Sequence, residues 1–200
     1  MIKKYRFLIA RRFTQLSIIA LYILANIYGI NILMGNLSNS LVLQTVNLSD
    51  PFAVLQMIFA GAIISFDIAL GALIISIFYF ILGGRAFCSW VCPVNIITDS
   101  ANYLRRVLKF DEVQKKQPAT RNLRYWLILI SFIISYFMGV AAFELISPVS
   151  MVHRGLIFGL GFGLATMIVI FLFDLFVLKN GWCGHICPLG GFYSLIGRFS

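Results

Sequence analysis

Charged residues are scarce in this sequence, and acidic ones are the scarcest. Only 12% of the 200 residues are charged, and Asp and Glu together number 7. A soluble domain carries about 25% charged residues, so this chain has too little polar surface to cover a water-soluble globule. The low charge also excludes a disordered chain. Four cysteines are too few for a secreted disulfide scaffold, and 16 glycines are too few for collagen.

Apolar residues make up 60% of the chain and gather in four long stretches. These stretches cover residues 13–34, 65–82, 125–143 and 160–178. Each is close to the roughly 20 residues that a helix needs to cross the hydrocarbon core of a bilayer. The sequence therefore predicts an all-α integral membrane protein, with four transmembrane helices in a single membrane domain over residues 1–200.

Basic residues give the expected orientation. All of the 16 Lys and Arg residues except Arg154 fall before the first span, between the second and third spans, or after the fourth. Because basic residues gather on the cytoplasmic side of a membrane, both termini and the middle segment are predicted to face the cytoplasm. The net charge of +9 is thus read as a topology signal, and we expect no nucleic-acid partner.

Two outer segments each begin with a polar residue followed by proline, Asp50-Pro51 and Ser147-Pro148. A capping side chain before a proline at the first helical position is a typical helix start. We expect short interfacial helices on the outer side at both places. The alternative is that these segments extend the second and fourth spans.

The chain contains an internal duplication, with one repeat over about residues 1–110 and the other over about 120–200. Each repeat ends in a Cys-rich turn, GGRAFCSWVCPV in the first and LKNGWCGHICPL in the second. Cys88 corresponds to Cys183 and Cys92 to Cys187, both at an offset of 95 positions. Each repeat crosses the membrane twice, so the two are expected to be parallel repeats that bring both turns together at the cytoplasmic face.

All four cysteines of the protein lie in these two C-x3-C-P turns. The prolines disfavour α geometry at the preceding cysteine, so each motif is predicted to end a helical turn. Four convergent thiolates are soft metal ligands, and zinc and an iron–sulfur cluster are both open readings. Disulfides are disfavoured in a reducing compartment, and the matched duplication argues against four merely buried thiols.

A second candidate site lies on the outer side. His153 and Arg154 form its only strongly basic spot, and Glu144 lies at the outer end of the third span. Quinol oxidation needs a proton acceptor, and histidine titrates in a suitable range. These three residues are a candidate quinone site, and the alternative is the polar face of an interfacial helix.

The stretches GRAFCSWVCPVNIITD, ISPVSMVHRGLIFG and FLFDLFVLKNGWCGHICPLGGFYSLIGRFS, with NLSDPF, resemble the NapH family of membrane subunits. The resemblance implies a multi-pass protein of the bacterial inner membrane, a subunit of a quinol-oxidising complex rather than a stand-alone enzyme. It implies electron transfer from menaquinol or ubiquinol through iron–sulfur centres, most simply a 4Fe-4S cluster, towards periplasmic nitrate reductase. A NapG-like ferredoxin subunit is the implied partner.

Members of that family usually continue into a cytoplasmic region with two further ferredoxin-type motifs, which this sequence does not contain. A complete electron path is therefore not expected from these 200 residues alone. Two other functions remain open from the sequence, a four-span thiol–disulfide oxidoreductase and a non-catalytic membrane anchor or assembly factor for a redox complex.

Overall fold

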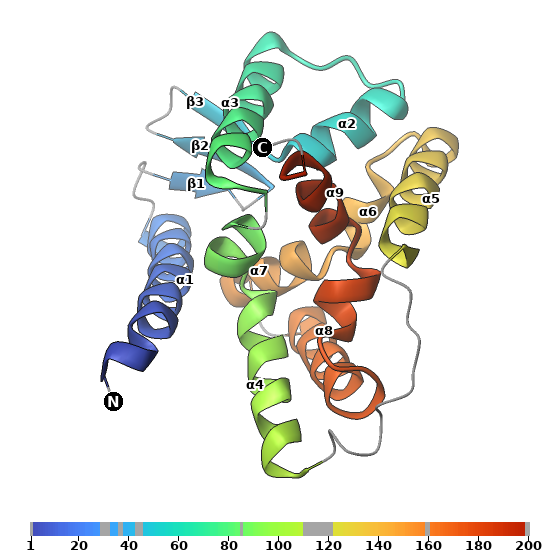
Figure 1. Ribbon diagram of the computed structural model, residues 1–200. Coiled ribbons are helices and arrows are strands. Elements are labelled where there is room, and N and C mark those ends of the chain that lie inside the picture. The colour runs from blue at the N-terminus through green and yellow to red at the C-terminus, as the bar shows by residue number, and fades with distance from the viewer. Residues whose placement is uncertain are drawn as a thin grey trace.

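A computed structural model describes residues 2–28, 33–35, 38–42, 46–84, 86–109, 122–158 and 161–198. Helices dominate this part of the chain, as the sequence predicts (Figure 1). In the first half they are α1 (Ile2–Tyr28), α2 (Pro51–Phe59), α3 (Phe66–Leu82), a π-helical turn η1 (Phe87–Val91) and α4 (Val94–Val107). In the second half they are α5 (Leu123–Met138), α6 (Ala142–Ile146), α7 (Pro148–Phe158), α8 (Gly161–Leu172), η3 (Phe173–Val177), η4 (Trp182–Ile186) and α9 (Pro188–Ile196).

The structure is mainly helical, as predicted, and adds a small antiparallel sheet that the sequence did not indicate. Its strands β1 (Leu33–Gly35), β2 (Asn39–Val42) and β3 (Val46–Ser49) lie in sequence order. The sheet packs against α3, where Gly71 lies so close to the strand that an added Cβ would be 1.7 Å from the carbonyl oxygen of Asn47. The predicted first span is therefore wrong at its C-terminal end, because residues 33 and 34 belong to β1.

The apolar stretches become helices of different lengths. The part of α1 from Arg6 to Asn26 has the length and composition to cross a membrane, and it is the one such helix among the described residues. Three more apolar helices, Phe66–Leu82, Leu123–Met138 and Gly163–Val177, are shorter. The third predicted span ends early because Gly139 takes the left-handed conformation, with φ of 67°, that caps a helix.

The two halves of the chain interlock. α3 of the first half contacts α9 of the second, and α8 of the second half contacts α4 of the first. The contact of α3 with α9 requires a glycine, since a Cβ at Gly84 would lie 1.7 Å from the carbonyl oxygen of Tyr193. These reciprocal contacts are what a pseudo-twofold relation between the repeats predicts.

Both proline-initiated segments do form short helices, α2 and α7. Asp50 caps α2, with its side chain accepting from the backbone N–H of Phe52. The starts of these helices, however, lie against residues of the Cys-turn region. Asp50 contacts Tyr193 of α9, and Pro148 lines a cavity together with the cysteines. The structure thus brings the N-terminal ends of both helices to the Cys-turn region. Their predicted location on the outer side of the membrane stays a prediction.

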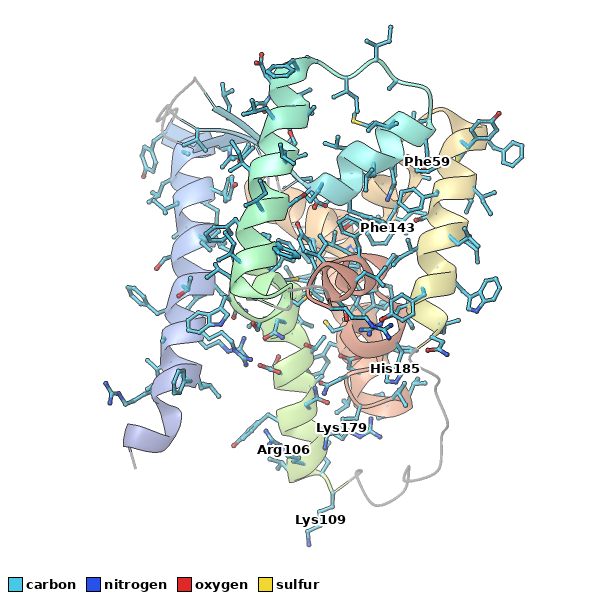
Figure 2. The ribbon with its side chains drawn as sticks, turned by 45° about the horizontal axis from the view of Figure 1, so that its top comes forward. Phe59, Arg106, Lys109, Phe143, Lys179 and His185 are labelled. Atoms are coloured by element: carbon cyan, nitrogen blue, oxygen red, sulfur yellow. The ribbon has the colours of Figure 1, made fainter. Side chains whose placement is uncertain are left out.

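Basic side chains gather at one end of the molecule. Figure 2 shows Arg106, Lys109 and Lys179 together at that end, near the termini of α4 and η3. Large apolar side chains are exposed along α3 and α5, among them Ile81 and Phe137. Exposed apolar residues also lie beside the basic ones, since Val107, next to Arg106, is 60% exposed.

Candidate metal centre

The two Cys turns have the same backbone conformation. In each, a π-helical turn ends at the second cysteine, whose N–H donates to the carbonyl five residues earlier, Cys92 to Phe87 and Cys187 to Trp182. The φ and ψ angles are −65° and 121° at Cys92, and −65° and 111° at Cys187. Both cysteines are extended, as expected before proline, so the prediction that each motif ends a helical turn is confirmed.

The four cysteines line one small cavity between the halves. Its walls also include Phe87, Trp182 and Leu189. The cavity volume is about 20 Å³, and its lining is mainly apolar and aromatic. All four thiols are free. The structure therefore brings together from two distant segments the residues that the sequence singled out.

Backbone N–H groups approach the second sulfur of each motif in the same way. The Cys187 Sγ accepts from the N–H of Gly190 at 3.5 Å, within the first turn of α9. The Cys92 thiol interacts with the N–H groups of Val94 and Asn95 at the start of α4. Hydrogen bonds to cysteine sulfurs are one of the ways in which proteins tune iron–sulfur clusters.

Burial makes these thiols poor acids when no metal is bound. Desolvation raises the pKa of Cys92 to about 12, with a smaller contribution from Cys187. Desolvation likewise raises the pKa of Cys183 well above its usual value, and the neighbouring thiols add to it. A bound cation reverses this balance because it stabilises the thiolate, so metal binding here would displace protons.

Zinc and an iron–sulfur cluster place different demands on the four thiols. Among the described residues, no three His, Cys, Asp or Glu side chains lie close enough together to hold a single metal ion. Zinc in a four-cysteine site requires four sulfurs at about 2.3 Å from one atom. A cluster of several irons separates its ligands further, and cysteine thiolates are its usual ligands. The cavity has about the volume of one water, so a cluster held by these four residues would require the two turns to lie further apart.

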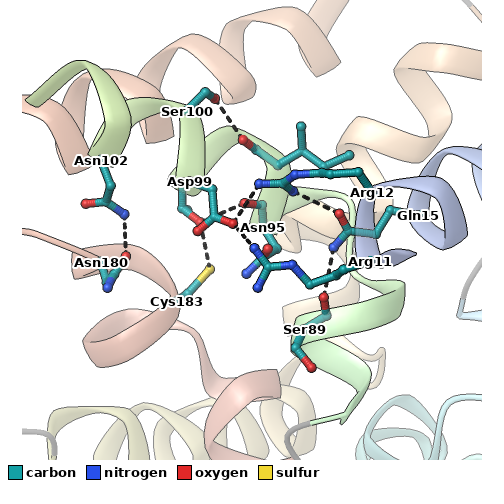
Figure 3. Close-up of polar contacts among 12 residues, drawn as sticks. Arg11, Arg12, Gln15, Ser89, Asn95, Asp99, Ser100, Asn102, Asn180 and Cys183 are labelled. Atoms are coloured by element: carbon teal, nitrogen blue, oxygen red, sulfur yellow. Dashed lines mark hydrogen bonds and ion pairs between the residues drawn. The ribbon is translucent and has the colours of Figure 1, made fainter. Parts of the chain in front are cut away.

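Gln15 is a residue that sequence reasoning missed. Its fully buried side chain donates from Nε2 to the carbonyl oxygens of Ser89 at 3.1 Å and Cys92 at 3.3 Å. Arg12 donates to Gln15 Oε1 at 2.9 Å and to Asp99 at 2.6 Å, and Arg11 also pairs with Asp99 (Figure 3). A glutamine inside an apolar span was the available signal, and α1 thereby holds the first Cys turn in place.

The second turn is held by different side chains. Asp174, fully buried, accepts at Oδ1 from the N–H of Trp182 at 2.9 Å. Its backbone carbonyl accepts from Arg105 of α4 at 3.1 Å. Thr98 of α4 lies 3.9 Å from the Cys183 sulfur, which donates to it. These contacts connect α4 of the first half to the Cys turn of the second.

The candidate quinone residues are not assembled into a site by the described contacts. Glu144 lies on α6 and accepts from the Ser150 hydroxyl at 2.6 Å. His153 and Arg154 fall within α7, but their side chains lie outside the part of the structure that is described. The quinone role of these residues stays a prediction.

Comparisons with known proteins agree with the Cys-turn geometry. A family model described as a 4Fe-4S binding domain matches residues 64–111 and 160–200, and each segment contains one Cys turn. No solved structure matches.

Curated relatives cover nearly the whole chain. The methylamine utilization ferredoxin-type protein MauN of Methylorubrum extorquens is 40% identical over 95% of this chain and 65% of its own length. MauN of Paracoccus denitrificans is 41% identical over 98% of the chain and 68% of its length. The ferredoxin-type protein NapH of Escherichia coli is 40% identical over 98% and 67%. The chain thus spans about two thirds of the length of these relatives.

The likeness extends over both repeats and includes both Cys turns, so it is not confined to one motif. Together with the 4Fe-4S domain match, it identifies an iron–sulfur electron-transfer protein. This chain belongs to the family of NapH and MauN ferredoxin-type proteins.

Proposed function

We propose that this chain is the membrane electron-transfer subunit of a quinol-oxidising complex, with an iron–sulfur cluster held by Cys88, Cys92, Cys183 and Cys187. The observation that carries the proposal is the pair of Cys turns with the same backbone conformation, whose four cysteines line one apolar cavity. When bound, the cluster supplies a one-electron carrier. The protein supplies four thiolates, N–H donors to the sulfurs, and aromatic walls that exclude water.

Metal and sulfide analysis of anaerobically purified protein, with electron paramagnetic resonance of the reduced sample, tests the cluster assignment. We expect iron and acid-labile sulfide in equal amounts and a cluster signal. A preparation that contains neither, with four reactive thiols, would contradict the assignment and favour thiol–disulfide chemistry. Zinc in place of iron would also contradict it.

The proposed location is the bacterial inner membrane, crossed four times with both termini inside. Exposed apolar side chains on α3 and α5 support it, because a water-soluble protein rarely leaves so much contiguous apolar surface uncovered. Single cysteines at two exposed positions, Ile63→Cys and Val107→Cys, test the orientation. A membrane-impermeant thiol reagent should label the first in intact cells and the second only after permeabilisation. The reverse pattern would overturn the topology.

Quinol is the proposed electron donor. Oxidation of one quinol to quinone releases a pair of electrons and a pair of protons, so the electrons must leave singly through the cluster while protein or water accepts the protons. The proposed acceptor is a NapG-like ferredoxin subunit, and periplasmic nitrate reductase is the proposed terminal partner. Because the NapH and MauN relatives are equally similar, an electron route in methylamine utilization is the second candidate.

A chimera distinguishes the two routes. This chain replaces the matching segment of NapH in Escherichia coli, which leaves the rest of NapH in place. Quinol-dependent nitrate reduction should be retained, and it should be lost in the same chimera with Cys88→Ser. Failure in NapH, combined with success of the equivalent chimera in MauN of Paracoccus denitrificans, would favour the second candidate.

A further inference from the structure

A second cavity lies beside the first Cys turn. Its volume is about 310 Å³, and it is bounded by α1, the small sheet, α3, η1 and α9. Its lining is apolar and aromatic apart from a few hydroxyls and one carboxyl, and comprises Tyr22, Ser40, Leu48, Asp50, Ile74, Ile75, Phe78, Tyr79, Phe87, Val91 and Tyr193. An apolar pocket of this size with a few convergent polar groups is typical of a small-molecule site.

The polar groups at this cavity form a buried pair. The Tyr193 hydroxyl donates to Asp50 Oδ1 at 2.8 Å, and both residues are buried. Asp50 itself is positioned as the cap of α2, where it also accepts from the N–H of Phe52 at 3.4 Å. Since the tyrosine proton is directed at the carboxylate, the tyrosine oxygen presents its lone pairs to a hydroxyl donor from the cavity.

The cavity adjoins the cysteines through a single aromatic layer. Phe87 lines both this cavity and the one between the four thiols. Its ring stacks on that of Tyr193, with centroids 4.7 Å apart and planes 21° apart. Phe87 directly precedes Cys88, and Val91, which also lines the cavity, directly precedes Cys92.

The same cavity reaches the apolar surface of the molecule. Ile74 and Phe78 of α3 line it, yet their side chains are 44% and 53% exposed. These residues lie on an apolar helix that is proposed to face lipid. A hydrophobic ligand dissolved in the bilayer can therefore enter from the side.

We propose that this cavity binds the head group of a membrane quinol, with one quinol hydroxyl donating to the Tyr193 oxygen while Asp50 holds the tyrosine proton. The inference rests on the proposed function, in which quinol is the electron donor. It places the ligand at α3 and the first Cys turn, away from α7, where His153 lies. Phe87 and Tyr193 then form the layer between the head group and the cysteine cavity.

Binding of a fluorescent hydroxyquinoline N-oxide, a quinol analogue whose emission is quenched on binding, tests the site directly. The chain is reconstituted anaerobically in nanodiscs of quinone-free lipid. Tyr193→Phe removes only the hydroxyl and should weaken binding by about three- to tenfold, the range for one hydrogen bond. Ile74→Trp fills the cavity from an exposed position and should weaken binding at least as much.

Matched controls lie on α5. Tyr136→Phe and Ile133→Trp make the same two changes at exposed positions and should leave the affinity unchanged. Iron content and elution volume confirm that each variant is folded.

If the parent protein binds the analogue but neither cavity variant weakens it, this site is wrong while quinol binding stands. Weakening by Glu144→Gln alone would move the ligand to the outer candidate site. If the parent with intact iron does not bind, the quinol part of the proposed function also fails.

Discussion

The two Cys turns share a backbone and differ in what surrounds them. Position 79 in the first half corresponds to 174 in the second, and these are Tyr79 and Asp174. Thr98 of the first half lies near Cys183 of the second turn. The equivalent position in the second half is Tyr193, which lines the cavity beside the first turn. The first turn borders a cavity of about 310 Å³, while the second is braced by Asp174 and Arg105. Duplication thus supplies two equivalent cysteines in each half. The residues around the turns have diverged, so the first turn borders a cavity that suits a ligand, whereas hydrogen bonds hold the second turn in place.

The largest expected effect tests whether the two Cys turns contribute equally to one cluster. Cys88→Ser and Cys183→Ser occupy equivalent positions, so each should abolish most of the bound iron and sulfide. Iron and sulfide per chain, with the resonance signal of the reduced protein, measure it. Ser76→Ala on α3 is a control that should keep full iron. Full iron in one cysteine variant and none in the other would show that the two turns do not contribute equally to one cluster.

Replacing Asp174 should damage the second turn more than the first. Asp174→Leu leaves the buried N–H of Trp182 without its acceptor, which costs about 2–3 kcal/mol of the free energy of unfolding. Tyr79→Phe, at the equivalent position of the first half, removes a hydroxyl only and should cost less. Thermal unfolding in detergent measures both. Equal destabilisation by the two variants would contradict the assignment of a bracing role to Asp174 alone.

Asp50 should make the stability of the folded protein depend on pH. Desolvation raises the pKa of this buried carboxyl from 3.8 to about 7, and the Tyr193 hydrogen bond opposes the shift. Because the folded state holds the proton more tightly than the unfolded state, stability falls as the pH rises from about 4 to about 7. Between pH 5 and pH 8 the loss is on the order of 2 kcal/mol.

Asp50→Asn should remove this dependence on pH, as followed by thermal unfolding at the two pH values. A parent protein that becomes more stable as the pH rises from 5 to 7 would be inconsistent with a raised pKa of the buried Asp50 carboxyl.

The smallest expected effect concerns Gln15, whose side chain holds the first Cys turn against α1. Gln15→Leu removes the two side-chain hydrogen bonds to the carbonyls of Ser89 and Cys92, at a cost of about 1 kcal/mol. The first turn should then release iron faster to a chelator, since α1 no longer holds it. Gln15→Glu keeps the volume but replaces the amide donor with a carboxyl that faces two carbonyl oxygens, so release should be at least as fast as in the leucine variant. Unchanged release in both would limit Gln15 to packing.

Much of the fold follows from local pattern. The four apolar stretches, the helix starts at Pro51 and Pro148, and the extended cysteines before proline could all be read from the sequence, because they depend on composition and on the conformational preferences of a few residues. The sheet could not, since its strands are three or four residues long and hold together through cross-strand pairing.

The candidate metal site was predictable for a different reason. Two copies of the C-x3-C-P motif at equivalent positions of the two repeats indicate that the motifs lie close together. In the structure all four cysteines line one cavity, which is consistent with that prediction. The contact of Gln15 with the first Cys turn and that of Asp50 with Tyr193 were not predictable, because each joins residues at least 70 positions apart and nothing in the local sequence names the partner.

The sequence by itself determined that the chain is apolar, that it contains an internal duplication and that it carries four thiols. These properties follow from counting residues and comparing segments along the chain. Only the tertiary structure decided that α2 and α7 turn their N-terminal ends towards the Cys turns, and that Asp50 meets Tyr193 beside Phe87. Such contacts arise where helices of the two halves cross. Their geometry depends on how closely the helices can approach one another. Gly84, just after α3, allows close contact with α9 because it has no side chain.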